Sequence, residues 1–152
     1  MSLYSLRPEA VLIAKVASKP AVLSLLAERF AEAYQLEAAT VLERIEERER
    51  LGSTGFGRGV AIPHARIPNL KRPVAALIRL AEPIEFAAAD GLPVDLVFGL
   101  LSPENSGVAH LHALAAISRL MREERIHEAL VEAPDAEALY ALLTNVSDRD
   151  AA

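Results

Sequence analysis

The sequence of 152 residues is long enough for one domain with one core and leaves little room for a second. Its 52% hydrophobic and 24% charged residues are typical of a globular protein, and a net charge of -5 gives no general attraction to nucleic acid or anionic lipid. The lack of cysteine excludes disulfides, thiolate metal sites and cysteine nucleophiles, and no segment has the roughly 20 apolar residues of a membrane span. We therefore expect one domain over residues 1–152, located in the cytoplasm and binding no nucleic acid.

Two amphipathic helices are predicted in the first third of the chain. Ser18 is a good N-cap and Pro20 suits a first helical turn, and apolar residues recur at helical spacing over residues 19–34. A second helix is predicted over residues 40–50, and it ends at Gly52 because glycine is a common helix terminator.

A glycine-rich loop and several strands follow. Four of the eight residues over 52–59 are glycine, which permits positive φ and close approach of the backbone to a ligand. A short strand is predicted over residues 60–62 and is stopped by Pro63. Further strands are predicted over residues 74–80, 84–86 and 94–101, with a loop over 102–107. The strand over 94–101 is almost wholly apolar, which is typical of a central strand covered on both faces.

The last third of the chain is predicted to be helical. Helices are expected over residues 108–125, 125–132 and 136–143. The order helix, helix, strands, helix, helix indicates an α/β or α+β domain, in which one sheet is covered by helices.

His64 is the most informative candidate for chemistry. It follows Pro63 at the end of a predicted strand, five residues after the glycine-rich loop. Backbone N–H groups in such a loop can hold a phosphate, and a neutral imidazole beside them can attack phosphorus. The alternative is a histidine in a polar loop that only hydrogen-bonds a carbonyl group.

The other histidines differ in the face they occupy. Within the helix predicted over 108–125, His110 falls on the apolar stripe and is expected to face inward, whereas His112 falls on the polar face. The alternative to a functional role for His110 is a hydrogen-bonded histidine at the edge of the core, and His127 is expected to be exposed. Two histidines at i and i+2 of one helix do not readily share an ion, so no metal site is expected.

The glycine-rich loop does not match the common nucleotide-binding patterns. It lacks the Gly-Lys-Ser/Thr ending of a P-loop, and it leads into a strand where the dinucleotide motif leads into a helix, so no nucleotide is expected. Arg48 and Arg50 end the helix before the loop, where a guanidinium can bind phosphate through two hydrogen bonds. The alternative is that both are solvated cations at a helix C-terminus.

Three segments taken together carry a resemblance to a known family. Residues 48–64 read RERLGSTGFGRGVAIPH, residues 93–101 read PVDLVFGLL, and residues 110–114 read HLHAL. In order and spacing they resemble the fructose/mannitol-type (type 2) enzyme IIA domains of the bacterial phosphotransferase system. The likeness covers a core from about residue 5 to about residue 145, and the first segment is most similar to the nitrogen-regulatory enzyme IIA proteins.

The resemblance implies a fold and a set of roles. The fold is a single mixed β-sheet flanked by helices. His64 would accept a phosphoryl group on Nε2 from a phosphohistidine of the carrier protein HPr or its nitrogen-branch paralogue, and His110 and Arg48 would support the phosphate. The resemblance implies no cofactor or metal, and it implies a phosphoryl-transfer intermediate without a small substrate of its own.

Three functions fit these features. The first is a regulatory phosphocarrier whose partners are proteins such as sensor kinases or potassium transport proteins. The second is a sugar-uptake enzyme IIA that passes phosphate to a permease IIB component. The third is a binding-only domain in which His64 is never phosphorylated.

Two arginines and an apolar group distinguish the surroundings of His64. Arg58 and Arg66 stand where the family is expected to carry smaller residues, lysine or glycine, and both are expected to add positive charge near the histidine. An apolar docking patch for a partner is expected around Phe56, Ile62 and Ile67.

Overall fold

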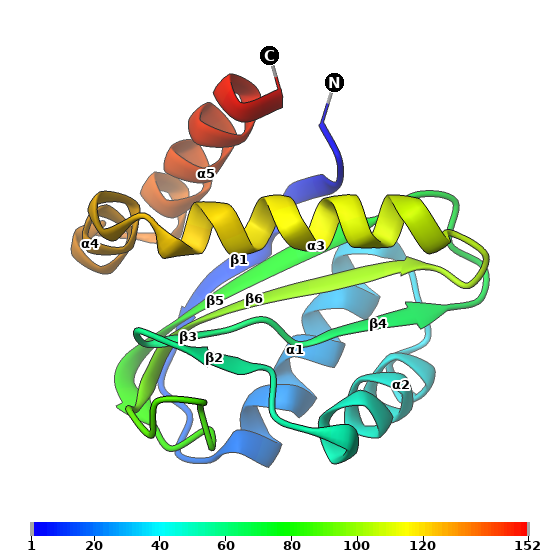
Figure 1. The fold of residues 1–152 in the computed structure, drawn as a ribbon, viewed down its shortest axis with the longest axis horizontal. Helices are drawn as coiled ribbons and strands as arrows, with labels where there is room; N and C mark the ends of the chain where they lie inside the picture. The colour runs from blue at the N-terminus through cyan, green and yellow to red at the C-terminus, as the bar shows by residue number, and fades with distance from the viewer. Residues whose placement is uncertain (1, 152) are drawn as a thin grey trace.

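A mixed sheet of six strands lies between two groups of helices in the computed structural model, which describes residues 2–151 and their side chains as far as residue 145 (Figure 1). The helices are α1 (Lys19–Tyr34), α2 (Ala38–Leu51), α3 (Gly107–Arg122), α4 (Glu124–Glu132) and α5 (Ala136–Ala151). The strands are β1 (Ser5–Ala14), β2 (Gly55–Gly57), β3 (Val60–Ala61), β4 (His64–Ile67), β5 (Val74–Ile84) and β6 (Val94–Pro103). This architecture confirms the expected α/β class with one mixed sheet flanked by helices.

Strand β6 organises the sheet. It pairs antiparallel with β5 on one side and parallel with both β3 and β4 on the other, where β3 and β4 follow one another along the same edge. Strand β1 lies parallel to β5, and β2 pairs antiparallel with β3. Every residue of β6 except Asp95 is buried, which confirms the prediction of a central strand covered on both faces.

The helices form two layers, one on each side of the sheet (Figure 1). Helices α1 and α2 pack on one face, where Leu26, Phe30 and Ile45 are fully buried. Helices α3, α4 and α5 lie on the other side, where Phe98 of the sheet packs in one cluster with Ile117 of α3. None of the helices in residues 2–151 is long and apolar enough to cross a membrane.

Both helices predicted in the first third of the chain are confirmed, and the second extends slightly beyond the predicted residues 40–50. Helix α1 covers the predicted residues, and the Ser18 Oγ caps it by accepting a hydrogen bond from the Ala21 N–H at 3.3 Å. Helix α2 begins at Ala38 and ends at Leu51, with Gly52 as its C-cap residue.

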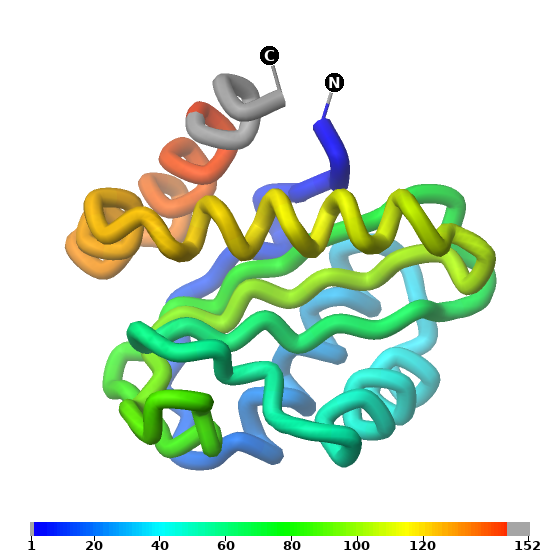
Figure 2. Tube along the Cα trace, viewed as in Figure 1, coloured from blue at the N-terminus to red at the C-terminus, as the bar shows by residue number. Residues whose placement is uncertain are grey.

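Strand β1 is the longest element that the sequence pattern does not predict. It lies at the edge of the sheet, where the blue N-terminal segment runs beside β5 with Ser5 opposite Val74 (Figure 2). The exposed residues 7–9 interrupt its apolar pattern, and the pairing register shifts at this point. This irregularity hides the period of two residues by which a half-buried strand is recognised.

Smaller corrections concern the lengths of elements. The strands predicted over 74–80 and 84–86 form one strand, β5, whose pairing with β6 is irregular after Arg79. The glycine-rich segment contains β2, although only a loop is expected there. The helix expected over 108–125 ends at Arg122, and α4 begins two residues later.

Two further corrections concern the candidate site. Pro63 does not end strand pairing, because β4 begins at His64 in register with Leu100 of β6. Ser102 is expected in a loop but continues β6, where it is fully buried. His64 and Ser102 are therefore both fixed by sheet pairing.

The packing of α1 on β6 makes Gly99 intolerant of a side chain. A Cβ at Gly99 would lie 2.8 Å from Cε2 of Phe30 and 3.0 Å from both Cδ atoms of Leu26, all in the core. We expect Gly99→Ala to lower the free energy of unfolding by about 1–3 kcal/mol through overpacking, measured by urea denaturation. Gly107→Ala is the matched control, because a Cβ there meets no atom within 4 Å. Equal stability of the two variants would contradict this packing.

Candidate functional site

Three elements meet beside the start of β4. Strand β4 carries His64, the first turn of α3 carries His110, and the last two turns of α2 carry Arg48. The two imidazole rings have centroids 5.6 Å apart and planes inclined by 45°. Together they line an open hollow of about 400 Å³, whose other lining residues are Arg44, Glu47, Leu51, Ala65, Arg66, Leu111 and Leu114. The structure thus brings together the three residues singled out in the sequence.

The ring of His64 is oriented by one backbone hydrogen bond. Its Nδ1 lies 2.7 Å from the carbonyl oxygen of Ile62. Because a carbonyl oxygen only accepts, Nδ1 carries the hydrogen and Nε2 carries the lone pair of the neutral ring. Burial lowers the pKa of His64, and the charges of Arg48 and Arg66 lower it further, against the opposing effects of the Ile62 hydrogen bond and Glu49. His64 is therefore neutral at pH 7 with Nε2 available as a nucleophile.

His110 is held by a side chain that the sequence analysis does not single out. Its Nδ1 lies 2.7 Å from Oγ of Ser102, which is fully buried at the end of β6. A serine hydroxyl can donate to Nδ1, and in that arrangement the ring hydrogen of His110 is on Nε2. The sequence signal that Ser102 offers is a hydroxyl-bearing residue directly after the apolar run over 94–101.

The environment of His110 keeps it uncharged. Its side chain is 4% exposed, which confirms that it faces inward, whereas His112 is exposed as predicted. Burial lowers the pKa of His110 to about 4, with further contributions from the charges of Arg66 and His64. Two neutral imidazoles therefore stand side by side at pH 7.

Arg48 is fixed by the loop that follows α2. Its Nη1 donates a hydrogen bond to the Gly52 carbonyl oxygen at 2.9 Å. The neighbouring Glu49 accepts hydrogen bonds from both the backbone N–H and the hydroxyl of Thr54, and it forms a 2.8 Å ion pair with Lys19 of α1. The start of the glycine-rich segment is thus attached to two helices, and this attachment positions Arg48 at the hollow.

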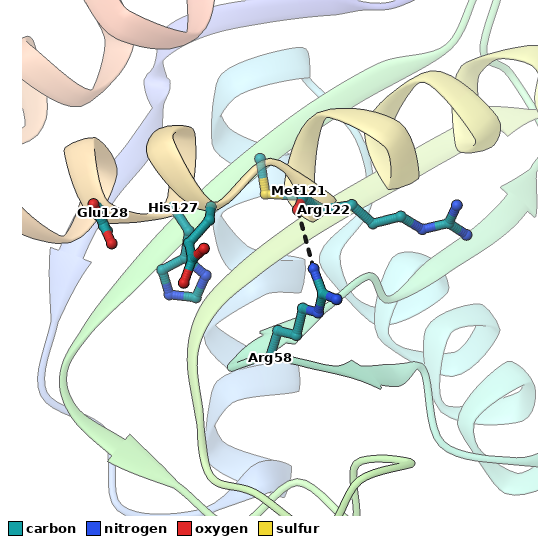
Figure 3. Close-up of a pocket in the computed structure, with 6 residues that line it drawn as sticks. Arg58, Met121, Arg122, His127 and Glu128 are labelled. Carbon is teal, nitrogen blue, oxygen red and sulfur yellow. Dashed lines mark hydrogen bonds between the residues drawn. The ribbon is translucent and has the colours of Figure 1, made fainter.

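Two expectations about side-chain placement are wrong. Arg58 does not line the hollow around His64, because its Nη1 donates to the Arg122 carbonyl at 3.3 Å and its side chain lines a different hollow (Figure 3). His127 lines that second hollow as well and is half-buried, with Nε2 3.1 Å from Oδ1 of Asp95. Contacts with segments far apart in the sequence determine both positions, and no local pattern reports them.

The expected docking patch is also wrong. Ile62 and Ile67 are 4% and 2% exposed, so they belong to the core. Phe56 is half-buried and packs against the same core cluster as Ile62. The apolar side chains that are accessible at the hollow are instead Leu51, which is 85% exposed, and Leu111, which is 59% exposed. Among the described residues, no group of three or more His, Cys, Asp or Glu side chains is placed to hold a metal ion.

Comparisons with known proteins cover nearly the whole chain. The family model for the phosphoenolpyruvate-dependent sugar phosphotransferase system, EIIA 2, matches residues 5–146. A nitrogen regulatory protein of Bradyrhizobium diazoefficiens is 47% identical over 137 residues, which are 90% of this chain and 90% of that protein. The crystal structure of the nitrogen regulatory protein IIA-Ntr from Neisseria meningitidis, 39% identical, matches with a TM-score of 0.84 over 91% of this chain and 95% of that one.

A third comparison concerns the fold alone. The chain matches, with a TM-score of 0.74 and 18% identity, a structure of the complex between enzyme IIA and phosphorylated enzyme IIB of the Escherichia coli mannitol system. The match covers 93% of this chain and 99% of that one. In that protein the same fold binds a phosphorylated IIB partner.

The low pKa of His110 links stability to pH. The pKa is about 4 in the folded protein against the ordinary value of 6.5 for histidine, so protons bind the unfolded chain more tightly. The stabilising contribution is complete above pH 6.5 and is lost as the pH falls towards 4. Between pH 7 and pH 5 we expect wild type to lose about 2 kcal/mol more unfolding free energy than His110→Gln, measured by guanidinium denaturation. An equal loss in both proteins would show that His110 is not buried in its neutral form.

Proposed function

The chain belongs to the EIIA 2 family of the phosphoenolpyruvate-dependent sugar phosphotransferase system, and we propose that it is a regulatory phosphohistidine carrier that accepts its phosphoryl group on His64. One observation carries the proposal: the hydrogen bond from Nδ1 of His64 to the Ile62 carbonyl leaves the Nε2 lone pair as the nucleophile. The donor is a phosphohistidine of HPr or of its nitrogen-branch paralogue, as the resemblance of the sequence implies.

The transfer requires no change in the number of protons on either ring. The lone pair of His64 Nε2 forms the new N–P bond while the N–P bond of the donor phosphohistidine breaks. A donor ring that carries its own N–H leaves as neutral imidazole, and His64 keeps the hydrogen that it donates to Ile62. Because the phosphoryl group in flight is metaphosphate-like, alignment and charge stabilisation supply most of the rate.

His110 and Arg48 supply that stabilisation in the proposed mechanism. With its hydrogen on Nε2, His110 donates a hydrogen bond to a phosphoryl oxygen, and the Ser102 hydroxyl maintains this tautomer. Arg48 offsets the negative charge of the group from the end of α2. The transferred group adds close to two negative charges to this surface, which changes how the surface meets a partner.

The relatives favour regulation over sugar uptake. Proteins named as nitrogen regulatory proteins match this chain at up to 47% identity over 90% of both sequences. The proposed partners are therefore regulatory proteins, with sensor kinases and potassium transport proteins as the candidates that the resemblance offers. The competing candidate is transfer to a permease IIB component, since the mannitol IIA of the same fold forms a complex with phosphorylated IIB.

Phosphoryl transfer from phosphoenolpyruvate, through enzyme I and HPr or its paralogue, tests the proposal directly. We expect radioactive phosphate on wild type and none on His64→Ala, because the substitution removes the proposed nucleophile. His112→Ala is the matched control, since it removes an exposed histidine from the same helix as His110. Arg48→Gln should lower the transfer rate about ten- to hundredfold by removing one stabilising cation.

The outcomes separate the two phosphocarrier functions from a binding-only domain. Label that persists on His64→Ala would contradict the assignment of the acceptor. An unlabelled wild type, in a relay that labels a control acceptor, would leave a binding-only domain with this fold.

A further inference from the structure

Three arginines line the hollow around His64, and two of them are already engaged. Arg48 donates to the Gly52 carbonyl at 2.9 Å. Arg44 donates to the Arg66 carbonyl at 3.0 Å and to the carboxylate of Glu104 at 3.3 Å. The guanidinium of Arg66 forms no hydrogen bond or ion pair with any residue in the described part of the chain. Arg66 is therefore the cation at this site that can turn to a ligand without losing an existing contact.

The alternation of β4 places Arg66 beside His64. Ala65 and Ile67 point into the core, so His64 and Arg66 share the other face of the strand. Residues two apart on one strand are separated by about 7 Å, which the long arginine side chain can span. The charge of Arg66 lowers the pKa of both His64 and His110, so the field of the guanidinium reaches both rings.

The charge balance of the hollow depends on Arg66. Arg44 is neutralised by its ion pair with Glu104, and Glu47 lines the hollow together with Arg48. Without Arg66, the positive charges of the arginines and the negative charges of the carboxylates around His64 would therefore sum to zero. A phosphoryl group brings close to two negative charges, so an extra cation at this point stabilises it.

We propose that Arg66 is a second phosphoryl-binding arginine, which binds oxygens of the N-phosphoimidazole formed on His64. The proposal rests on the phosphocarrier function above and adds a residue to its site. The planar guanidinium can donate two parallel hydrogen bonds to two phosphoryl oxygens, which an ammonium group cannot do. Arg66 thus stabilises the phosphorylated form and the transfer, while Arg48 remains fixed by its loop.

Phosphotransfer equilibria with purified donor test this role. Arg66→Gln should shift the equilibrium towards the donor by about tenfold, and Arg66→Lys, which keeps the charge, should recover part of that loss. Arg125→Gln is the charge-matched control, because Arg125 is exposed on α4 and lies outside the hollow. Added salt should narrow the gap between wild type and Arg66→Gln by screening the exposed cation.

A second measurement tests the role of Arg66 without the phosphoryl-transfer relay. In the unphosphorylated protein, NMR titration should show higher pKa values for His64 and His110 in Arg66→Gln than in wild type or Arg125→Gln. Inorganic phosphate should also shift these ring resonances at lower concentration in wild type than in Arg66→Gln. If wild type is never phosphorylated, the carrier function fails, and the phosphate titration still decides the role of Arg66. If Arg66→Gln and Arg125→Gln have the same phosphotransfer equilibrium constant and the same affinity for inorganic phosphate, the proposal is overturned.

Discussion

The site depends on one hydrogen bond, from Nδ1 of His64 to the carbonyl oxygen of Ile62, two residues earlier in the chain. This bond fixes the plane of the ring, places the hydrogen on Nδ1 and leaves the lone pair on Nε2. Burial favours the neutral ring, so the nucleophile exists at neutral pH without a general base. Backbone geometry thus sets the nucleophile of the proposed phosphoryl transfer before any partner arrives.

The fold explains why that carbonyl is a reliable acceptor. The Ile62 N–H donates to the Thr54 carbonyl at 2.9 Å, and the Leu100 N–H donates to the Pro63 carbonyl at 2.9 Å. Hydrogen bonds to the glycine-rich segment on one side and to the central strand β6 on the other therefore fix the backbone between β3 and β4. Thr54 is in turn bound by Glu49, so the same network that positions Arg48 also orients His64.

The sequence predicts the helices, the central strand and the inward face of His110 because each depends on a local period or cap. It does not predict the placement of Arg58, the burial of Ile62 and Ile67, or the contact of Ser102 with His110. Those features depend on which strand pairs with which, and in what register, and a single sequence does not report this. The resemblance supplies the roles of His64, His110 and Arg48, and the geometry supplies a physical reason for each.

The most direct test of this account is the tautomer of His64, read from long-range proton–nitrogen NMR correlations of the unphosphorylated protein at neutral pH. The account predicts a hydrogen on Nδ1 and an unprotonated Nε2, with the phosphorus attached at Nε2 after phosphorylation. A hydrogen on Nε2 in the free protein, or phosphorus on Nδ1 afterwards, would contradict the claim that the Ile62 carbonyl selects the nucleophile.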